Sequence, residues 1–467
     1  MKHATRMLLL AALALPGCGD NGGSNLTCNP DTVPTGCSGD FQCEVLTGAT
    51  GGRCYQPAYL LVKVMNSTNG DAAIAGARVV AIDGDTNAAA APAAITASDG
   101  TARIAVTWPR AQPDTEPSHA FTLRVSARGY YDYPGAMRIA IPVSVQRDPV
   151  KGLAPTNAEV RLIPMAQPLA GGIAGTVLES DGRKAARGVL VVAETSDVPP
   201  IGYTSVSDGN GAFEMLNVAA GTYTISGYFA GMSFPQSSVS VSGGPVRDLK
   251  LVADATPNLA TVSGQVNIVA GGGATTTTVV LRTRSTKDVP PGLRVTATSG
   301  AAFQITGVPT GTYEAVAAYG NDGLVLDPDT NTAGTQIQEI AVVGTPTGAT
   351  YQLDHAFKVT GAVQILSPGA TGTAELVSGA PVFRWKAYAQ ADHYKLALWD
   401  GIHPAPVWTI DNITTESFSY DDPSFPALDD GFIYQWTVEA WAVNPTARPL
   451  SRSEDQLGVF QYRAPAH

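Results

Sequence analysis

This 467-residue sequence is poor in the side chains that many enzymes use for catalysis. It has five cysteines, and none follows Cys54. It has six histidines, and none lies between His119 and His355. These gaps exclude a cysteine nucleophile after Cys54 and a Ser-His-Asp arrangement formed within the middle of the chain. No glycine-rich phosphate loop opens a helix either, so we expect no catalysis and no cofactor.

Charge and long apolar runs are also scarce. Charged residues make up 15% of the chain, and the net charge is −11. An acidic chain without a basic patch is a poor partner for nucleic acid, so none is expected. No apolar run reaches the ~20 residues that a membrane-spanning helix needs. The 49 glycines and 33 prolines favour an exported all-β protein with many turns.

The first seventeen residues, 1–17, have the pattern of an export signal. Lys2 and Arg6 precede a short apolar stretch that cannot cross a bilayer. The signal ends within the run LPGC at 15–18, just before its cysteine. This run resembles the lipobox of bacterial lipoproteins, although the proline departs from the usual small residue. The resemblance implies cleavage before Cys18 and lipidation of its thiol.

An ordinary signal cleaved after 12–14, Ala-Leu-Ala, is the alternative. The cysteine count favours lipidation, because removing Cys18 from the set leaves four cysteines that can pair. Two or more acyl chains hold a protein firmly on a membrane. Gly19 stands where an aspartate would favour the inner membrane, so we expect an outer-membrane protein, periplasmic or surface-exposed.

The segment 18–57 is expected to be a lipidated tether followed by a small neck. It has too few apolar residues to bury a core of its own, so disulfides are the expected source of its stability. Three connectivities are open. A zinc site is less favoured, because the segment has no C-x-x-C pair and an exported protein meets oxidising conditions. The expected disulfide cysteines are Cys28, Cys37, Cys43 and Cys54.

One strand pattern repeats through the middle of the chain. Its clearest copy has a D-G-N-G run at 208–211, which suits a tight hairpin, followed by Phe213 and Tyr223 as core residues. This copy resembles the carboxypeptidase regulatory-like, transthyretin-like β-sandwich family, with D-x-x-G-x-F followed by P-x-G-x-Y; Ala219 replaces the proline. The resemblance implies accessory or structural modules rather than an enzyme. Three sandwiches are expected, a divergent first one at 58–167 and two closer copies at 168–255 and 256–355.

The final segment, 356–467, differs in composition and contains five of the six tryptophans. Its strand-like runs at 381–385, 394–399 and 434–440 resemble strands B, C and F of a fibronectin type III-like sandwich. Strand alternation points one set of side chains inward: Trp385, Leu396, Leu398, Tyr434, Trp436 and Val438.

The same alternation turns Trp399 and Trp441 outward and leaves Trp408 unassigned. Exposed aromatic rings can stack on sugars, so these three tryptophans are candidate ligand-binding residues. The favoured alternative is that they seal a sandwich edge or a domain interface. His393 and His403 are expected in exposed loops.

Two loops have the spacing D-x-D-x-N, which offers oxygen ligands for calcium. Both lack the glycine and glutamate of an EF-hand loop, so solvated turns are the favoured interpretation and no metal is assigned. The residues concerned are Asp83, Asp85 and Asn87 in the first loop, and Asp327, Asp329 and Asn331 in the second.

Together these patterns predict an all-β protein of tandem Ig-like or transthyretin-like sandwiches behind a signal peptide and a disulfide-rich neck. The expected function is a non-catalytic structural or adhesive display stalk, held on the membrane by N-terminal acyl chains. An envelope protein or a glycan is the expected partner. The alternative is a carbohydrate- or peptide-binding surface lipoprotein that uses the aromatic-rich final domain; an unrecognised hydrolase comes third.

Overall fold

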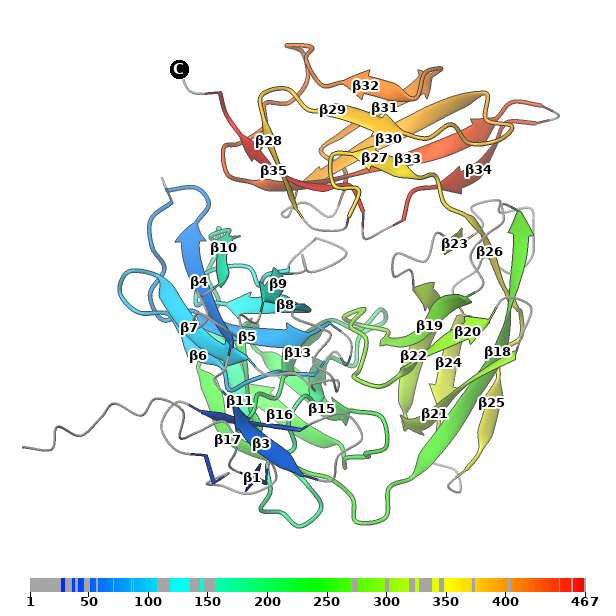
Figure 1. The fold of residues 1–467 in the computed structure, drawn as a ribbon. Coiled ribbons are helices and arrows are strands. Elements are labelled where there is room, and N and C mark those ends of the chain that lie inside the picture. Colours follow the sequence, from blue (N-terminus) through cyan, green and yellow to red (C-terminus); the bar gives the residue numbers. More distant parts are fainter. Residues whose placement is uncertain are drawn as a thin grey trace, which may run out of the picture. The chain divides into compact units, whose positions relative to one another are not determined.

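In the part of the chain that the computed structural model describes, all regular secondary structure is β-strand (Figure 1). Within that part, no helix has the length and apolarity to cross a bilayer. The chain divides into two units, 1–57 with 107–116 and 58–106 with 117–467. The described residues are 27–29, 36–37, 41–45, 51–55, 58–69, 71–84, 86, 88–106, 118–134, 143–146, 156–270, 276–298, 302–318, 324–326, 338–343, 348–371, 374–400, 405–444, 446–454 and 457–465.

The neck forms a three-stranded antiparallel sheet in the order β1-β3-β2. Cys43 on β2 lies directly opposite Cys54 on β3, and Cys54 is buried. The strands are β1 (Thr27–Cys28), β2 (Gln42–Val45) and β3 (Gly52–Tyr55).

The first sandwich pairs a three-stranded sheet, β10-β4-β7, with a four-stranded sheet, β6-β5-β8-β9. Strand β4 alternates buried and more exposed residues along most of its length, whereas β5 is buried throughout. The strands are β4 (Ala58–Asn66), β5 (Arg78–Asp83), β6 (Ala94–Ile95), β7 (Thr101–Val106), β8 (Ser118–Ser126), β9 (Val143–Gln146) and β10 (Thr156–Leu162).

The second sandwich has the same arrangement, with sheets β14-β11-β17 and β13-β12-β15-β16. The D-G-N-G run forms the turn between β13 and β14: the Asp208 carboxylate accepts backbone N–H bonds from Asn210 (2.8 Å) and Ala212 (3.1 Å). Gly211 there has φ +75°, which suits a residue without Cβ. The strands are β11 (Gly171–Leu178), β12 (Leu190–Glu194), β13 (Gly202–Val206), β14 (Ala212–Val218), β15 (Gly221–Tyr228), β16 (Ser237–Val241) and β17 (Pro245–Val252).

The third sandwich contains the sheets β21-β18-β26-β23, with β25 also on β18, and β20-β19-β22-β24. Because β26 pairs with β18, this sandwich extends to Gly361, beyond the expected end at residue 355. The strands are β18 (Leu259–Ala270), β19 (Thr276–Thr283), β20 (Arg294–Thr298), β21 (Ala302–Pro309), β22 (Gly311–Ala318), β23 (Leu324–Leu326), β24 (Gln338–Val342), β25 (Thr350–Gln352) and β26 (Phe357–Gly361).

One topology recurs in these three sandwiches. The first strand of each pairs with an antiparallel fourth strand on one side and a parallel closing strand on the other. The second strand of each pairs with the third and fifth strands in the facing sheet. The expected all-β fold of tandem sandwiches is therefore confirmed.

The C-terminal sandwich packs the sheet β27-β29-β32 against the sheet β28-β35-β33-β30-β31, in which β34 also pairs with β33. All six side chains expected to point inward are buried, and Trp385 and Trp436 are among the largest fully buried ones. The strands are β27 (Ile365–Ser367), β28 (Glu375–Ser378), β29 (Val382–Trp385), β30 (His393–Asp400), β31 (Trp408–Ile413), β32 (Ser417–Ser419), β33 (Ile433–Ala442), β34 (Arg448–Arg452) and β35 (Val459–Arg463).

The first three sandwiches share buried apolar contacts. One hydrophobic cluster includes Val80 from the first sandwich, Leu190 and Tyr228 from the second, and many residues of the third. The Tyr228 ring meets the Tyr313 ring of the third sandwich edge to face, with centroids 5.8 Å apart. Burial of this surface stabilises the three sandwiches together rather than one at a time.

Polar side chains also cross the junction between the first and second sandwiches. Asn217 is buried, and its carboxamide accepts the Gly129 N–H (2.9 Å) and donates to the carbonyls of Ala127 (2.9 Å) and Tyr130 (2.7 Å). These hydrogen bonds satisfy the side-chain amide of the second sandwich and three backbone groups of the first. The contact also fixes how the turn after β8 lies against β14.

The carboxylate of Asp208 forms hydrogen bonds within its own sandwich and to the first sandwich. Its Oδ1 accepts the backbone N–H groups of its own turn, and its Oδ2 accepts the backbone N–H of Ala93 in the first sandwich (3.0 Å). Arg78 of the first sandwich is buried beside it, with an N···O distance of 3.9 Å, and donates to the Ala212 carbonyl (3.1 Å).

A second polar contact joins all three sandwiches. Asp288 of the third sandwich forms an ion pair with Arg124 of the first. Thr204 of the second sandwich donates its hydroxyl hydrogen to Asp288 (2.9 Å) and accepts from Arg124 (3.3 Å). Two strands, β8 and β13, and the loop between β19 and β20 therefore meet at one group of hydrogen bonds, although they are far apart in the sequence.

Candidate functional site

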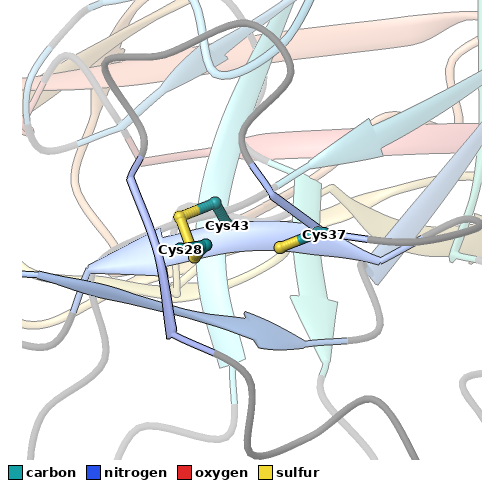
Figure 2. Close-up of side chains that lie close together, drawn as sticks. All are labelled: Cys28, Cys37 and Cys43. Atoms are coloured by element: carbon teal, nitrogen blue, oxygen red, sulfur yellow. A yellow bond between two sulfur atoms is a disulfide. The ribbon is translucent and has the colours of Figure 1, made fainter.

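The neck cysteines form two disulfides that lie close together. Figure 2 shows the sulfur of Cys28 bonded to that of Cys43, with Cys37 beside them. The second bond joins Cys37 to Cys54. Of the three connectivities that the sequence left open, the structure therefore has first-to-third and second-to-fourth pairing.

The same sulfurs resemble a metal cluster in their spacing. The Sγ atoms of Cys28, Cys37 and Cys43 lie within 4.8 Å of one another. Metal binding requires thiolates, and each of these sulfurs is already bonded to another sulfur. The neck is therefore held by disulfides.

Several predicted site residues lie outside the described residues. These are Cys18, Asp85, Asn87, His403, Asp327, Asp329 and Asn331. Lipidation and both calcium loops accordingly stay predictions.

Asp83, the first residue of one candidate calcium loop, is described and buried. Its Oδ1 accepts the backbone N–H of Thr86 (2.8 Å), and its Oδ2 lies 2.7 Å from His119 Nε2. Burial raises the pKa of this carboxyl, but the hydrogen bonds from His119 and Thr86 outweigh burial, so the pKa lies below its usual value.

Trp408 lies on the inner side of its sheet. It is opposite Leu398 on β30, which is fully buried. Its ring contacts the rings of Phe418, Tyr420 and Phe425, with centroids 5.0–5.4 Å apart. Trp408 thus extends the aromatic core toward the sandwich edge.

Trp441 lies on the outer side and is half-buried. Its indole stacks on the His393 ring, with centroids 6.2 Å apart, and its Nε1–H donates to the Glu439 carboxylate (3.1 Å). His393 was expected in a loop, but it begins β30 and lies 3.5 Å from Asp411. The expectation for His393 is wrong because the strand starts earlier than its apolar residues suggest.

Trp399 also points outward and is half-buried, near the far end of β30. Trp441 is opposite His393, six residues from Trp399 along β30. At ~3.3 Å per residue that places the two tryptophans about 20 Å apart along the sheet. They therefore do not form one aromatic platform.

Between the two tryptophans, the outer face carries a row of alternating charge. Lys395 on β30 is directly opposite Glu439 on β33, which is directly opposite Arg452 on β34. Opposite charges at facing positions of neighbouring strands attract one another.

The next row along the sheet consists of small side chains. Ala397 on β30 faces Thr409 on β31 and Thr437 on β33. Because Ala397 has only a methyl group, the surface dips there between larger side chains. The result is a hollow of about 180 Å³ lined by Trp399, Lys395, Ala397, Pro406, Thr409, Thr437, Glu439 and Arg452.

The sequence reasoning selected Trp399 but missed the other residues around this hollow. Ala397 and Lys395 share the alternation of Trp399, and Thr437 and Glu439 share that of Trp441, so their outward direction was readable. The register of β30, β31, β33 and β34 was not readable, and it is the register that places Arg452 beside Glu439.

Comparisons with known proteins give weak matches. No protein family matches the sequence, and no curated protein does. Among solved structures, the chain matches the Bacillus anthracis TIE protein at 12% identity and TM-score 0.17, covering 67% of this chain and 53%, about half, of that one. It matches a streptococcal ancillary pilin at 13% identity and TM-score 0.17, covering 63% and 98%. It matches two B repeat units of the Staphylococcus aureus collagen-binding protein at 11% identity and TM-score 0.18, covering 87% and 98%. The β-sandwich architecture therefore rests on the strand pairing described above.

Proposed function

We propose that this protein is a lipid-anchored envelope protein that acts as a non-catalytic structural or adhesive display scaffold. The observation that carries the proposal is the coupling of the first three sandwiches through buried side chains. Modules joined only by linkers move independently by default. Here Asn217, Asp208 and the Arg124–Thr204–Asp288 group bond across the junctions, so the three sandwiches behave as one stiff body.

A stiff body of this kind suits the presentation of a further domain. The C-terminal sandwich follows the coupled three in the chain and has its own aromatic core. Its outer sheet face carries charged and aromatic side chains around a small hollow. A scaffold that presents such a face to a partner in the envelope is the function these features support best.

The membrane attachment in this proposal rests on the motif at Cys18 and on the pairing of the other four cysteines. With Cys28, Cys37, Cys43 and Cys54 all paired, Cys18 is the one cysteine left for a lipid. An outer-membrane location, periplasmic or surface-exposed, is the finer part of the proposal.

The family assignments are likewise part of the proposal. The Asp208 turn and the recurring topology support carboxypeptidase regulatory-like modules in the first three sandwiches. The three-stranded sheet facing a larger sheet that contains β30 and β33 supports a fibronectin type III-like module at the C-terminal end.

Detergent partition tests the anchor. The chain is expressed in a bacterium with lipoprotein-processing enzymes and separated in Triton X-114, and its mature N-terminus is measured by mass spectrometry. We expect the protein in the detergent phase with acylated Cys18, and Cys18→Ser in the aqueous phase. The double variant Cys28→Ser with Cys43→Ser is the matched control and should stay in detergent. An unmodified mature N-terminus, or a wild-type chain in the aqueous phase, would contradict the anchor.

A further inference from the structure

The hollow on the outer face of the C-terminal sandwich combines the groups that recognise an acidic sugar. We propose that it binds a uronic acid residue of an acidic polysaccharide, a property that goes beyond the scaffold function. Trp399 supplies an aromatic surface at one end, and Lys395 and Arg452 supply positive charge at the other. The argument rests on the spacing, the charge and the location of these groups.

The spacing suits one sugar ring. Trp399 and Lys395 are four residues apart on β30, which is about 13 Å along an extended strand. Between them the floor is the Ala397 methyl group, so a ring can approach the sheet closely. The hollow, about 180 Å³, is smaller than a pocket that encloses a drug-sized ligand. It fits a ring that lies on the surface as part of a chain.

The polar side chains around the floor match a sugar ring with an acidic substituent. The Thr409 and Thr437 hydroxyls can donate and accept hydrogen bonds, and the Glu439 carboxylate accepts them from ring hydroxyls. Of the charged side chains that line the hollow, Lys395 and Arg452 are positive and Glu439 is negative. Arginine and lysine pair with carboxylates, so these two cationic side chains favour an acidic sugar over a neutral one.

Glu439 is held in place by its neighbour. Trp441 Nε1–H donates to its Oε2 (3.1 Å), and the Trp441 ring is stacked on His393. A carboxylate oriented in advance loses less entropy when a ligand binds. Trp441 is therefore a positioning residue for this site and does not line the hollow.

The location disfavours an extended peptide. The hollow lies over β30 and β33, and each of these strands has hydrogen-bonded strands on both sides. A peptide that binds by adding a strand needs an open sheet edge. Recognition over these central strands must come from side chains alone, which suits stacking and hydroxyl contacts.

Binding of defined acidic oligosaccharides tests the proposal. The full mature chain in mild detergent is titrated by calorimetry with a galacturonic acid pentamer, with its methyl ester, and with a glutamate decapeptide. We expect saturable binding of the acid, at least tenfold weaker binding of the uncharged ester, and weakening as salt rises. Absence of acid binding, equal binding of acid and ester, or tighter binding of the peptide would overturn the proposal.

Matched variants locate the site. We expect Trp399→Ala, Lys395→Gln and Ala397→Leu each to weaken binding at least tenfold; Ala397→Leu does so by filling the hollow without removing a polar group. Tyr131→Ala and Lys250→Gln change an exposed tyrosine and an exposed lysine in other sandwiches and should leave binding unchanged. Circular dichroism checks that each variant is folded.

The role of Trp441 has its own readout. Trp441→Phe keeps a ring beside His393 but removes the hydrogen-bond donor to Glu439. We expect a three- to tenfold loss of sugar affinity, because Trp399 can still stack on the sugar. Retained affinity in both Trp399→Ala and Ala397→Leu would overturn the site. These measurements use purified protein, so a failed membrane anchor and a failed sugar site give separate results.

Discussion

The second sandwich and the C-terminal sandwich place their polar side chains differently. The second sandwich has buried Asp208 and Asn217 at its border with the first sandwich. The C-terminal sandwich has Lys395, Glu439 and Arg452 across the outer face of its larger sheet. Both are two-sheet structures with a continuous apolar core, so the architecture does not explain the difference.

The difference follows from what each face has to contact. A buried polar group is costly unless it is hydrogen-bonded, and Asn217 meets that condition only with the turn of the first sandwich against it. A charged row on a half-exposed face has no such requirement, since water solvates it. Polar residues at the junctions therefore specify neighbours within the chain, whereas those on the outer face lie half-exposed to solvent.

The largest effect should come from a substitution in the aromatic core of the C-terminal sandwich. This substitution tests whether that sandwich unfolds independently of the first three. Trp436 is fully buried, and its Nε1–H donates to the Pro368 carbonyl (3.0 Å). We expect Trp436→Ala to cost about 3–5 kcal/mol. Because five of the six tryptophans lie in this sandwich, denaturant unfolding followed by fluorescence reports on it, while circular dichroism reports on all strands. If both transitions shifted together, the sandwiches would not be separate.

The disulfides come next in size. Cys28 and Cys43 are 15 residues apart, and closing a loop of that length contributes about 3 kcal/mol. We expect Cys28→Ser with Cys43→Ser to make the neck sensitive to limited proteolysis, with cleavage sites read by mass spectrometry. The pair Cys37→Ser with Cys54→Ser should act similarly, because its separation is 17. Unchanged cleavage in both pairs would mean that the neck does not depend on its disulfides.

The junction between the first two sandwiches should show a smaller, local effect. Asn217→Ala leaves the Gly129 N–H and the Tyr130 carbonyl without their side-chain partner, whereas the Ala127 carbonyl keeps the Tyr130 N–H (3.2 Å). This loss costs about 1–3 kcal/mol. We expect faster amide hydrogen exchange at Gly129 with little change in the C-terminal sandwich.

Backbone strain adds to this effect, because Asn217 has φ 54°, a region that alanine disfavours by about 1–2 kcal/mol. Asn217→Gly removes the same hydrogen bonds but tolerates this φ, so it isolates the hydrogen-bond loss. Protection at Gly129 that survives both substitutions would show that Asn217 does not couple the sandwiches.

The smallest effect concerns pH. The pKa of Asp83 lies below its usual value of ~3.9 in the folded chain. A depressed carboxyl pKa stabilises the fold above the unfolded-state pKa, and that stability is lost as pH falls through the folded-state pKa. We therefore expect stability to fall below about pH 4, and Asp83→Asn to reduce that dependence. Denaturant midpoints measured from pH 3 to 6 check this; an equal slope in both proteins would assign the effect to other groups.

Much of the fold could be predicted from particular residues. The alternation of Tyr434, Trp436 and Val438 predicted their burial, because side chains of a strand alternate between its two faces. The D-G-N-G run predicted its turn, because Gly211 accepts a positive φ that other residues resist. The even number of cysteines after Cys18 predicted disulfides, although not which cysteines pair.

Other features depend on contacts between residues far apart in the chain. The second oxygen of Asp208 accepts a hydrogen bond from a backbone N–H 115 residues earlier, and nothing near Asp208 in the sequence indicates it. Trp408 and Ile410 alternate with the polar Thr409 and Asp411, but it is the pairing of Trp408 with the buried Leu398 that shows which face points inward. The start of β30 at His393 was missed for the same reason, because cross-strand pairing extended the strand.

Local chemistry in the sequence thus determined the strands, the turns, the apolar faces and the supply of cysteines, because those depend on residues a few positions apart. The tertiary structure decided the disulfide pairing, the junction bonds of Asn217 and the grouping of Lys395, Glu439 and Arg452 around a small alanine. Strand register and sandwich docking set these, and both arise from the summed packing of many distant side chains rather than from any short stretch.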